Sequence, residues 1–189
     1  PPAAAPPPPP LPPPPGGGAP PPPPGALEKI NPPLRERSDI NLLLEGVADG
    51  TITILATDHA PHTPERKALD FESAPFGIVG LETALALYIK ALIEPGVIDW
   101  PRMIAMMTIE PARLCRLDRH GYGRLRVRDP GDVTVIDPNL EWTIRPAEFV
   151  GLSKNSPFDG WQVKGRAIAT VVAGEVRWEL SPAASPVSR

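Results

Sequence analysis

The chain has 189 residues, of which 41% are hydrophobic and 22% are charged, and its formal net charge is −3 at pH 7. The basic residues form no stripe or cluster, which argues against a nucleic-acid-binding protein. The single cysteine, Cys115, excludes an internal disulfide, and no apolar run approaches the roughly 20 residues of a membrane span. Because no charged segment followed by an apolar one opens the chain, we expect a cytoplasmic protein with no membrane or nucleic-acid partner.

Proline is concentrated at the beginning of the chain, where 16 of the 30 prolines fall in the first 24 positions. Residues 1–26 are almost entirely Pro, Ala and Gly, which leaves little surface to bury and predicts a disordered head. The head is either an unselected linker or a ligand for a proline-binding module, with Leu11 as its apolar anchor. Because the first residue is Pro1 rather than Met and the globular sequence begins abruptly at Leu27, we expect a piece of a longer protein.

The globular sequence opens with a predicted helix and a predicted strand. Ser38 is the expected N-cap and Gly50 the expected stop of a helix that carries an apolar stripe along one face. Residues 51–57 are β-branched and apolar on both faces, which is typical of a strand buried on both sides in a parallel sheet. The polar residues that follow this strand therefore lie where α/β folds commonly present reacting groups.

Helices and then strands follow along the chain. Three further helices are predicted, over residues 81–93, from Asp99 and Pro101 to Met107, and from Pro111 to Leu114. After Gly121 the pattern changes to short strands separated by turns. The predicted strands cover residues 132–137 (closed by Pro138), 141–144, 164–172 and 175–180, and the last two form a hairpin around Ala173 and Gly174. Residues 181–189 are expected to be a frayed tail.

The densest group of chemically capable side chains lies just after the predicted strand. Asp58, His59 and His62 fall within five positions, and the chain contains only three histidines. A carboxylate at this point can bind a metal or act as a general acid and base, but an Asp-His pair can also anchor a loop by hydrogen bonds. We interpret His59 as the more structural residue, since adjacent side chains at a strand end point apart, and His120 as part of a surface loop.

Four segments are similar to class I dihydroorotases. They are K-I-N-P-P-L-R at 29–35, A-T-D-H-A-P-H at 56–62, A-P-F-G-I-V-G-L-E-T at 74–83 and K-N-S-P-F at 154–158. The resemblance covers roughly residues 28–180 and implies an α/β fold. Residues 27–118 would be the C-terminal part of a (β/α)₈ TIM-type barrel, and residues 119–180 would be part of a small β-sandwich.

The resemblance also implies a function and a site. Class I dihydroorotases are zinc-dependent hydrolases that interconvert N-carbamoyl-L-aspartate and dihydroorotate in pyrimidine biosynthesis. By matching position, Asp58 would be a zinc ligand and the catalytic acid and base, which takes a proton from the metal-bound hydroxide and returns one to the leaving nitrogen. Asn31, His62 and the backbone at Phe76 and Gly77 would bind the substrate.

The chain departs from this family in what it lacks. A hydrolytic zinc needs three or four ligands, and the sequence contains no His-x-His pair or second acidic cluster to complete such a site. A full barrel also needs roughly 250 residues. We therefore expect a C-terminal portion that is inactive by itself. A homo-oligomer is one possibility for its assembly. Two alternatives remain open: a non-catalytic dihydroorotase-like subunit that supports aspartate transcarbamoylase, which the retained Asp58 and His62 argue against, and a proline-rich interaction protein.

Overall fold

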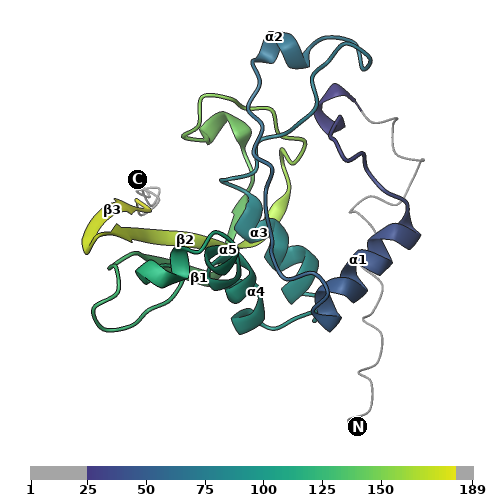
Figure 1. Ribbon diagram of the computed structural model, residues 1–189. Helices are drawn as coiled ribbons and strands as arrows, with labels where there is room; N and C mark the ends of the chain where they lie inside the picture. Colours follow the sequence, from purple (N-terminus) through teal and green to yellow (C-terminus); the bar gives the residue numbers. More distant parts are fainter. Residues whose placement is uncertain (1–24, 182–189) are drawn as a thin grey trace, which may run out of the picture.

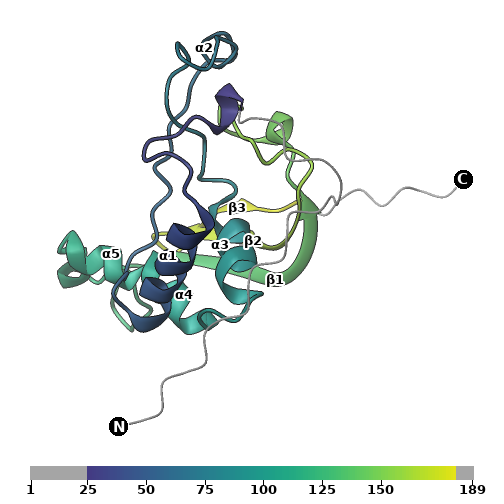
Figure 2. The same ribbon diagram turned by 90° about the vertical axis from the view of Figure 1, so that its right-hand side faces the viewer.

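The computed structural model describes residues 25–181, which form a series of short helices and a three-stranded antiparallel sheet (Figures 1 and 2). The elements in chain order are η1 (Ala26–Glu28), α1 (Arg37–Asp49), α2 (Pro64–Lys67), α3 (Ala84–Tyr88), η2 (Ile89–Ile93), α4 (Trp100–Met107), α5 (Ile109–Leu114), η3 (Leu117–His120), β1 (Val133–Thr143), η4 (Pro146–Glu148), β2 (Gln162–Val172) and β3 (Glu175–Glu179). The proposed disordered head and its Leu11 anchor fall in residues 1–24, outside the described part. Ala26, placed in the head by the sequence, already belongs to η1.

Helix α1 confirms the predicted helix but not its predicted cap. The N-cap position is Glu36, one residue before Arg37, so Ser38 lies inside the first turn. Gly50 ends the helix in the left-handed conformation, with φ 88°, as the sequence predicts. The helix begins two residues earlier than expected because the extended backbone of Glu36 (ψ 164°) already marks the change of direction. Ser38 therefore cannot accept the first free amides of the helix.

The prediction of a buried strand at residues 51–57 is wrong for the described structure. The segment is extended, but it belongs to no sheet, and its side chains are exposed or half-buried. It is held instead by single bonds to the helices, from the Leu55 amide to the Met106 carbonyl at 3.1 Å and from the Tyr88 hydroxyl to the Ala56 carbonyl at 2.8 Å. A strand exists only where a neighbour completes its ladder, and within residues 25–181 nothing pairs with this segment.

The helices that follow agree closely with the sequence. Helix α3 begins at Ala84 and continues directly into η2, a π-helix that ends at Ile93. Helix α4 has Asp99 as its N-cap, and the Asp99 carboxylate accepts a hydrogen bond from the Arg102 amide at 2.9 Å. Helix α5 begins at Ile109, two residues before the predicted Pro111. Among residues 25–181, no helix is long and apolar enough to cross a bilayer.

The sheet confirms the predicted hairpin and merges two predicted strands into one. Strands β2 and β3 pair around Ala173 and Gly174, whose φ values of 52° and 80° are those of a tight two-residue hairpin turn. Strand β1 continues through Pro138, where its register against β2 shifts. The sheet order β1-β2-β3 puts β1 at an edge. An edge strand tolerates proline because the missing amide would face away from the sheet.

Helices and sheet share their apolar core. One cluster of buried residues joins Val79, in the loop before α3, and Ala86 of α3 to three residues of the sheet region, Ile144, Phe149 and Val163. A second cluster lies among the helices and consists of Val47, Leu92, Val97 and Met106. The two parts that the sequence separates at residues 118 and 119 are thus packed together, and the division into domains stays a prediction.

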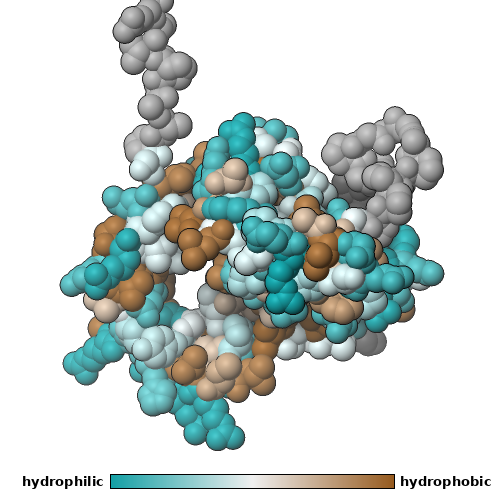
Figure 3. Space-filling view, turned by 90° about the horizontal axis from the view of Figure 1, so that it is seen from above, coloured by the Kyte–Doolittle hydropathy of each residue, from teal (hydrophilic) through white to brown (hydrophobic). Residues whose placement is uncertain are grey.

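Strand β2 approaches the helices very closely at one point. A Cβ on Gly165 would lie 2.1 Å from the Cδ1 atom of Ile89, so the absence of a side chain at Gly165 lets η2 pack against the sheet. Elsewhere the surface keeps many apolar side chains in contact with solvent, among them Leu114, Val127 and Leu152. Figure 3 shows such patches around a hollow on one face.

Candidate functional site

Three of the segments that carry the resemblance meet at one place. The Ala60 amide donates to the Ile78 carbonyl at 2.9 Å, which joins the loop after the extended segment to residues 74–80. The Gly77 amide donates to the Lys29 carbonyl at 2.9 Å, which joins residues 29–35 to the same point. These bonds link positions that are far apart in the sequence, so the chain folds to bring the segments together.

His62 and Phe76 form the most direct contact between predicted site residues. The ring Nε2 atom of His62 lies 2.8 Å from the Phe76 carbonyl oxygen. A carbonyl oxygen only accepts, so this contact requires the proton on Nε2. The other ring nitrogen, Nδ1, is then an acceptor when the imidazole is neutral and a donor when it is charged.

Gly77 lies close to Ala60 and His62. Its φ is 117°, a conformation that L side chains rarely adopt. Both of its backbone polar groups are engaged, because its amide binds Lys29 and its carbonyl accepts from the Asn155 side chain at 3.2 Å. The predicted substrate-binding backbone at Phe76 and Gly77 is therefore hydrogen-bonded within the protein in this arrangement.

Two buried lysines hold the loop that leads to Phe76. The Lys29 ammonium donates to the Glu72 carbonyl at 2.8 Å, and the Lys67 ammonium donates to the Pro75 carbonyl at 3.1 Å. Lys29 also lies 4.6 Å from the centre of the Phe76 ring, within the range of a cation–π contact. Burial, and secondarily the charge of Lys29, lowers the pKa of Lys67. Sequence reasoning missed both lysines, since a lysine is ordinarily exposed.

Asn155 is a third residue of this site that sequence reasoning missed. Its side chain is buried, with 4% of the residue exposed. The side-chain amide donates to the Ala60 and Gly77 carbonyls, and its oxygen accepts from the His62 amide. The K-N-S-P-F segment was the signal that could have found it, because a polar amide in a buried position must be hydrogen-bonded.

Asp58 and Asn31 belong to the segments that form this cluster, whereas His120 lies in η3. Asp58 is exposed and has φ 45°, which is unusual for a residue other than glycine. Next to it, the Nδ1 atom of His59 accepts a hydrogen bond from the Gly80 amide at 3.1 Å, in keeping with a loop-anchoring residue. Asn31 is exposed two positions after Lys29, and His120 is exposed in η3. The roles of Asp58 and Asn31 stay predictions.

The described residues do not by themselves fit a metal ion. Within residues 25–181, no group of three or more His, Cys, Asp or Glu side chains is close enough together to hold one. Asp58 offers one carboxylate, whereas a hydrolytic zinc needs three or four ligands.

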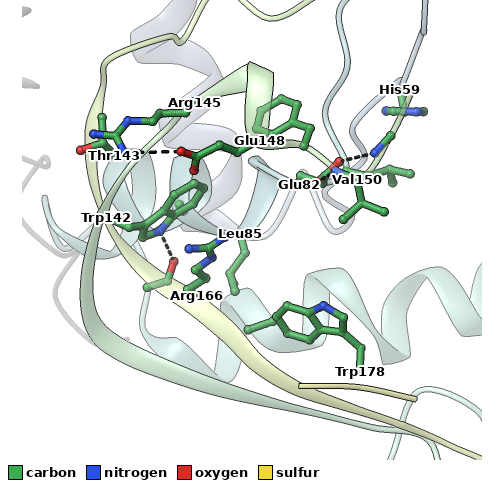
Figure 4. A pocket seen from close by; sticks show the side chains of 16 residues that line it. His59, Glu82, Leu85, Trp142, Thr143, Arg145, Glu148, Val150, Arg166 and Trp178 are labelled. Carbon is green, nitrogen blue, oxygen red and sulfur yellow. Dashed lines mark hydrogen bonds and ion pairs between the residues drawn. The ribbon is translucent and has the colours of Figure 1, made fainter. Parts of the chain in front are cut away.

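The cavity shown in Figure 4 is a different place from the predicted site. It has a volume of about 430 Å³ and lies between α3 and the sheet. Its lining includes His59, Leu85, Trp142, Arg166 and Trp178 but none of the five predicted site residues. The Arg166 guanidinium lies 4.6 Å from the centre of the Trp142 ring, and Trp142 donates to the Gly165 carbonyl. These contacts bridge β1 and β2, so the wall of the cavity is part of the packing of the sheet.

The comparisons with known proteins identify the class. The family model described as the amidohydrolase family matches residues 30–177, and the chain belongs to that family. Dihydroorotase from Geobacter sp. (strain M21) is 50% identical over 151 residues, which cover 80% of this chain and 35% of that protein. Dihydroorotase from Halalkalibacterium halodurans is 46% identical over 151 residues, which again cover 80% of this chain and 35% of that protein. The chain thus spans about 35% of the length of the curated relatives that it matches.

Solved structures agree with the family and show its fold. An L-hydantoinase (dihydropyrimidinase) from Arthrobacter aurescens superposes with a TM-score of 0.74 at 32% identity, covering 80% of this chain and 34% of that one. A D-hydantoinase (dihydropyrimidinase) from Thermus sp. gives 0.72 at 26% identity, covering 80% and 33%. The chain therefore has an α/β fold shared with part of the amidohydrolases. That residues 27–118 complete a barrel in the whole protein stays a proposal.

Proposed function

We propose that the protein to which this chain belongs is a dihydroorotase, which interconverts N-carbamoyl-L-aspartate and dihydroorotate in pyrimidine biosynthesis. The observation that carries the proposal is that the match to the amidohydrolase family, over residues 30–177, includes all five predicted site residues. Identities of 46–50% to dihydroorotases over most of the chain favour dihydroorotate over the hydantoins as the substrate. The candidate partner is thus a small molecule.

The proposed roles follow the positions of the side chains. Asp58, exposed directly after the extended segment 51–57, exchanges a proton with the reacting amide as the ring opens and closes. His62 binds the substrate through Nδ1, because Nε2 is held by the Phe76 carbonyl. Asn31 offers a donor and an acceptor to the edge of a cyclic amide. The backbone of Phe76 and Gly77 takes part only if the substrate displaces one of its present bonds.

Zinc belongs to the proposal for the whole protein. Asp58 is proposed as one ligand, and residues outside the described range 25–181 would supply the others. Association as a homo-oligomer or with aspartate transcarbamoylase, and a cytoplasmic location, stay predictions of the sequence.

The test uses a chimera in which residues 28–180 replace the matching segment of the Geobacter sp. dihydroorotase, beside the present chain alone. We expect the chimera to contain zinc by elemental analysis and to hydrolyse dihydroorotate, and the chain alone to do neither. Asp58→Ala in the chimera should abolish turnover. The unaltered Geobacter enzyme is the control for the assay.

One result would contradict the proposed substrate, and another would contradict the proposed source of the remaining zinc ligands. A folded, zinc-containing chimera that hydrolyses hydantoin or dihydrouracil better than dihydroorotate would assign another cyclic amide as substrate. Stoichiometric zinc and turnover in the chain alone, lost in Asp58→Ala, would mean that this chain completes a metal site by itself or as an oligomer.

A further inference from the structure

We infer that Asn155 is a positioning residue that holds His62 and Gly77 in the geometry needed to bind substrate, an inference that rests on the proposed function. Asn155 lies 93 positions after His62, in the segment between η4 and β2. Its side chain bonds only to backbone groups, those of Ala60, His62 and Gly77. It acts through the backbone of the two loops that carry the proposed substrate-binding residues.

All the polar atoms of the Asn155 side chain are engaged in this task. Its Nδ2 atom donates to the Ala60 carbonyl at 3.0 Å and to the Gly77 carbonyl at 3.2 Å. Its Oδ1 atom accepts from the His62 amide at 3.1 Å, and its backbone carbonyl accepts from the Val79 amide at 3.1 Å. One residue therefore closes four hydrogen bonds between three segments.

The two loops depend on this residue because they lack regular structure of their own. Residues 56–62 and 74–80 contain no helix or strand, so few backbone bonds fix their separation. Besides Asn155, the Ala60 amide bonds to Ile78 and the Gly80 amide bonds to His59. A buried side chain bonded to both loops sets the distance between them, and displacement of a binding group by about 1 Å can cost about 10²-fold in rate.

Asparagine is the residue type that suits the position. Two carbonyl oxygens need two N–H donors, and one amide needs an acceptor, which the carboxamide supplies on a short side chain. An aspartate of the same shape keeps the acceptor but turns an oxygen toward two carbonyl oxygens. A leucine of similar size satisfies none of the three backbone groups.

The experiment measures kcat and KM for dihydroorotate in the chimera carrying Asn155→Asp or Asn155→Leu. We expect kcat/KM to fall about 10²-fold, mainly through KM, with zinc content unchanged. Ser156→Ala is the matched control, since Ser156 is equally buried and its hydroxyl accepts from Phe158 in its own turn. It should keep kcat/KM within about twofold of the unsubstituted chimera.

A double variant separates positioning from a general loss of structure. Because Asn155 acts in part through His62, the losses in His62→Ala and Asn155→Asp should multiply to more than the loss in the double variant. If the double variant lost kcat/KM by the full product of the two single losses, the two residues would act independently and the inference would be overturned. An Asn155→Asp chimera with unchanged KM would also overturn it. Failure of the proposed function is distinguishable, because the unsubstituted chimera would then not turn over dihydroorotate at all.

If neither Asn155 variant folds, the unsubstituted chimera decides by hydrogen exchange. The inference expects the His62 amide, bound to the Asn155 side chain, to exchange slowly and to slow further when dihydroorotate binds. A His62 amide that exchanges as an unprotected group, or one indifferent to dihydroorotate, would overturn it.

Discussion

Gly77 and Ala60 approach so closely that a Cβ atom added to Gly77 would lie 2.4 Å from the Cβ atom of Ala60. The contact joins the two loops of the candidate site, and Gly77 has φ 117° at this point. Both the space and the backbone conformation therefore require glycine. This contact packs the two loops directly against each other.

Gly77→Ala in the chimera should lower both the thermal unfolding midpoint and the affinity for dihydroorotate. The strained φ alone costs on the order of 1–3 kcal/mol, and the overlap with Ala60 adds to it. Gly160→Ala is the control, because Gly160 also has a positive φ, of 77°, with nothing within 4 Å of an added Cβ. Equal effects of the two substitutions on the midpoint and on KM would contradict the close contact.

The tautomer of His62 is a second prediction. Neutral His62 should carry its proton on Nε2, because that atom lies 2.8 Å from a carbonyl oxygen. Long-range ¹H–¹⁵N spectra of the chimera with labelled histidine distinguish the two tautomers. A proton on Nδ1 in the neutral ring would show that the contact with Phe76 is not a hydrogen bond, and would remove the basis for substrate binding through Nδ1.

Asp58→Asn should separate catalysis from stability. The side chain of Asp58 is exposed, so we expect the unfolding midpoint to stay unchanged while kcat falls about 10²–10⁴-fold, the usual contribution of a general acid and base. Asp159→Asn, at another exposed aspartate, is the matched control and should leave kcat unchanged. An Asp58→Asn chimera with normal kcat would exclude Asp58 as the acid and base.

Asp99 at the start of α4 and Ser38 at the start of α1 offer a test of helix capping. Asp99→Ala removes the carboxylate that accepts from the Arg102 amide and should cost about 1 kcal/mol of local stability in α4. Hydrogen exchange at Arg102 should become roughly fivefold faster. Ser38→Ala should change little, because Ser38 does not occupy the N-cap of α1. If Ser38→Ala speeded hydrogen exchange in α1 more than Asp99→Ala speeds it in α4, Ser38 would be the N-cap that the sequence predicts.

The pH dependence of one ion pair follows from its geometry. Arg124 donates to the Asp129 carboxylate at 2.7 Å, and this hydrogen bond lowers the pKa of Asp129 below its usual 3.8. A carboxyl whose pKa is lower in the folded state stabilises the fold above the unfolded pKa, and that contribution is lost as the pH falls through the folded pKa. Carboxyl NMR titration should show the pKa of Asp129 returning toward its usual value in Arg124→Gln. An unchanged pKa in that variant would contradict the pairing.

Short-range features of this protein were readable from the sequence. The helices around Asp99 and residues 81–93 and the hairpin at Ala173 and Gly174 depend on neighbours in the chain, so local caps, periodicity and turn residues predict them. The family resemblance lay in short motifs, and the comparisons confirm the family. Those motifs also named His62, Phe76 and Gly77, which the structure brings together.

Only the tertiary structure decided the features that join distant segments. Residues 51–57 have the composition of a buried strand, but a strand needs partners for its backbone, and no neighbour within residues 25–181 provides them. Asn155 reaches the site across 93 positions. The buried ammonium groups of Lys29 and Lys67 are satisfied only because carbonyl oxygens of a folded loop accept hydrogen bonds from them. Such long-range hydrogen bonds leave no periodic trace in the sequence, because the partner of each polar group is set by the packing of the whole fold.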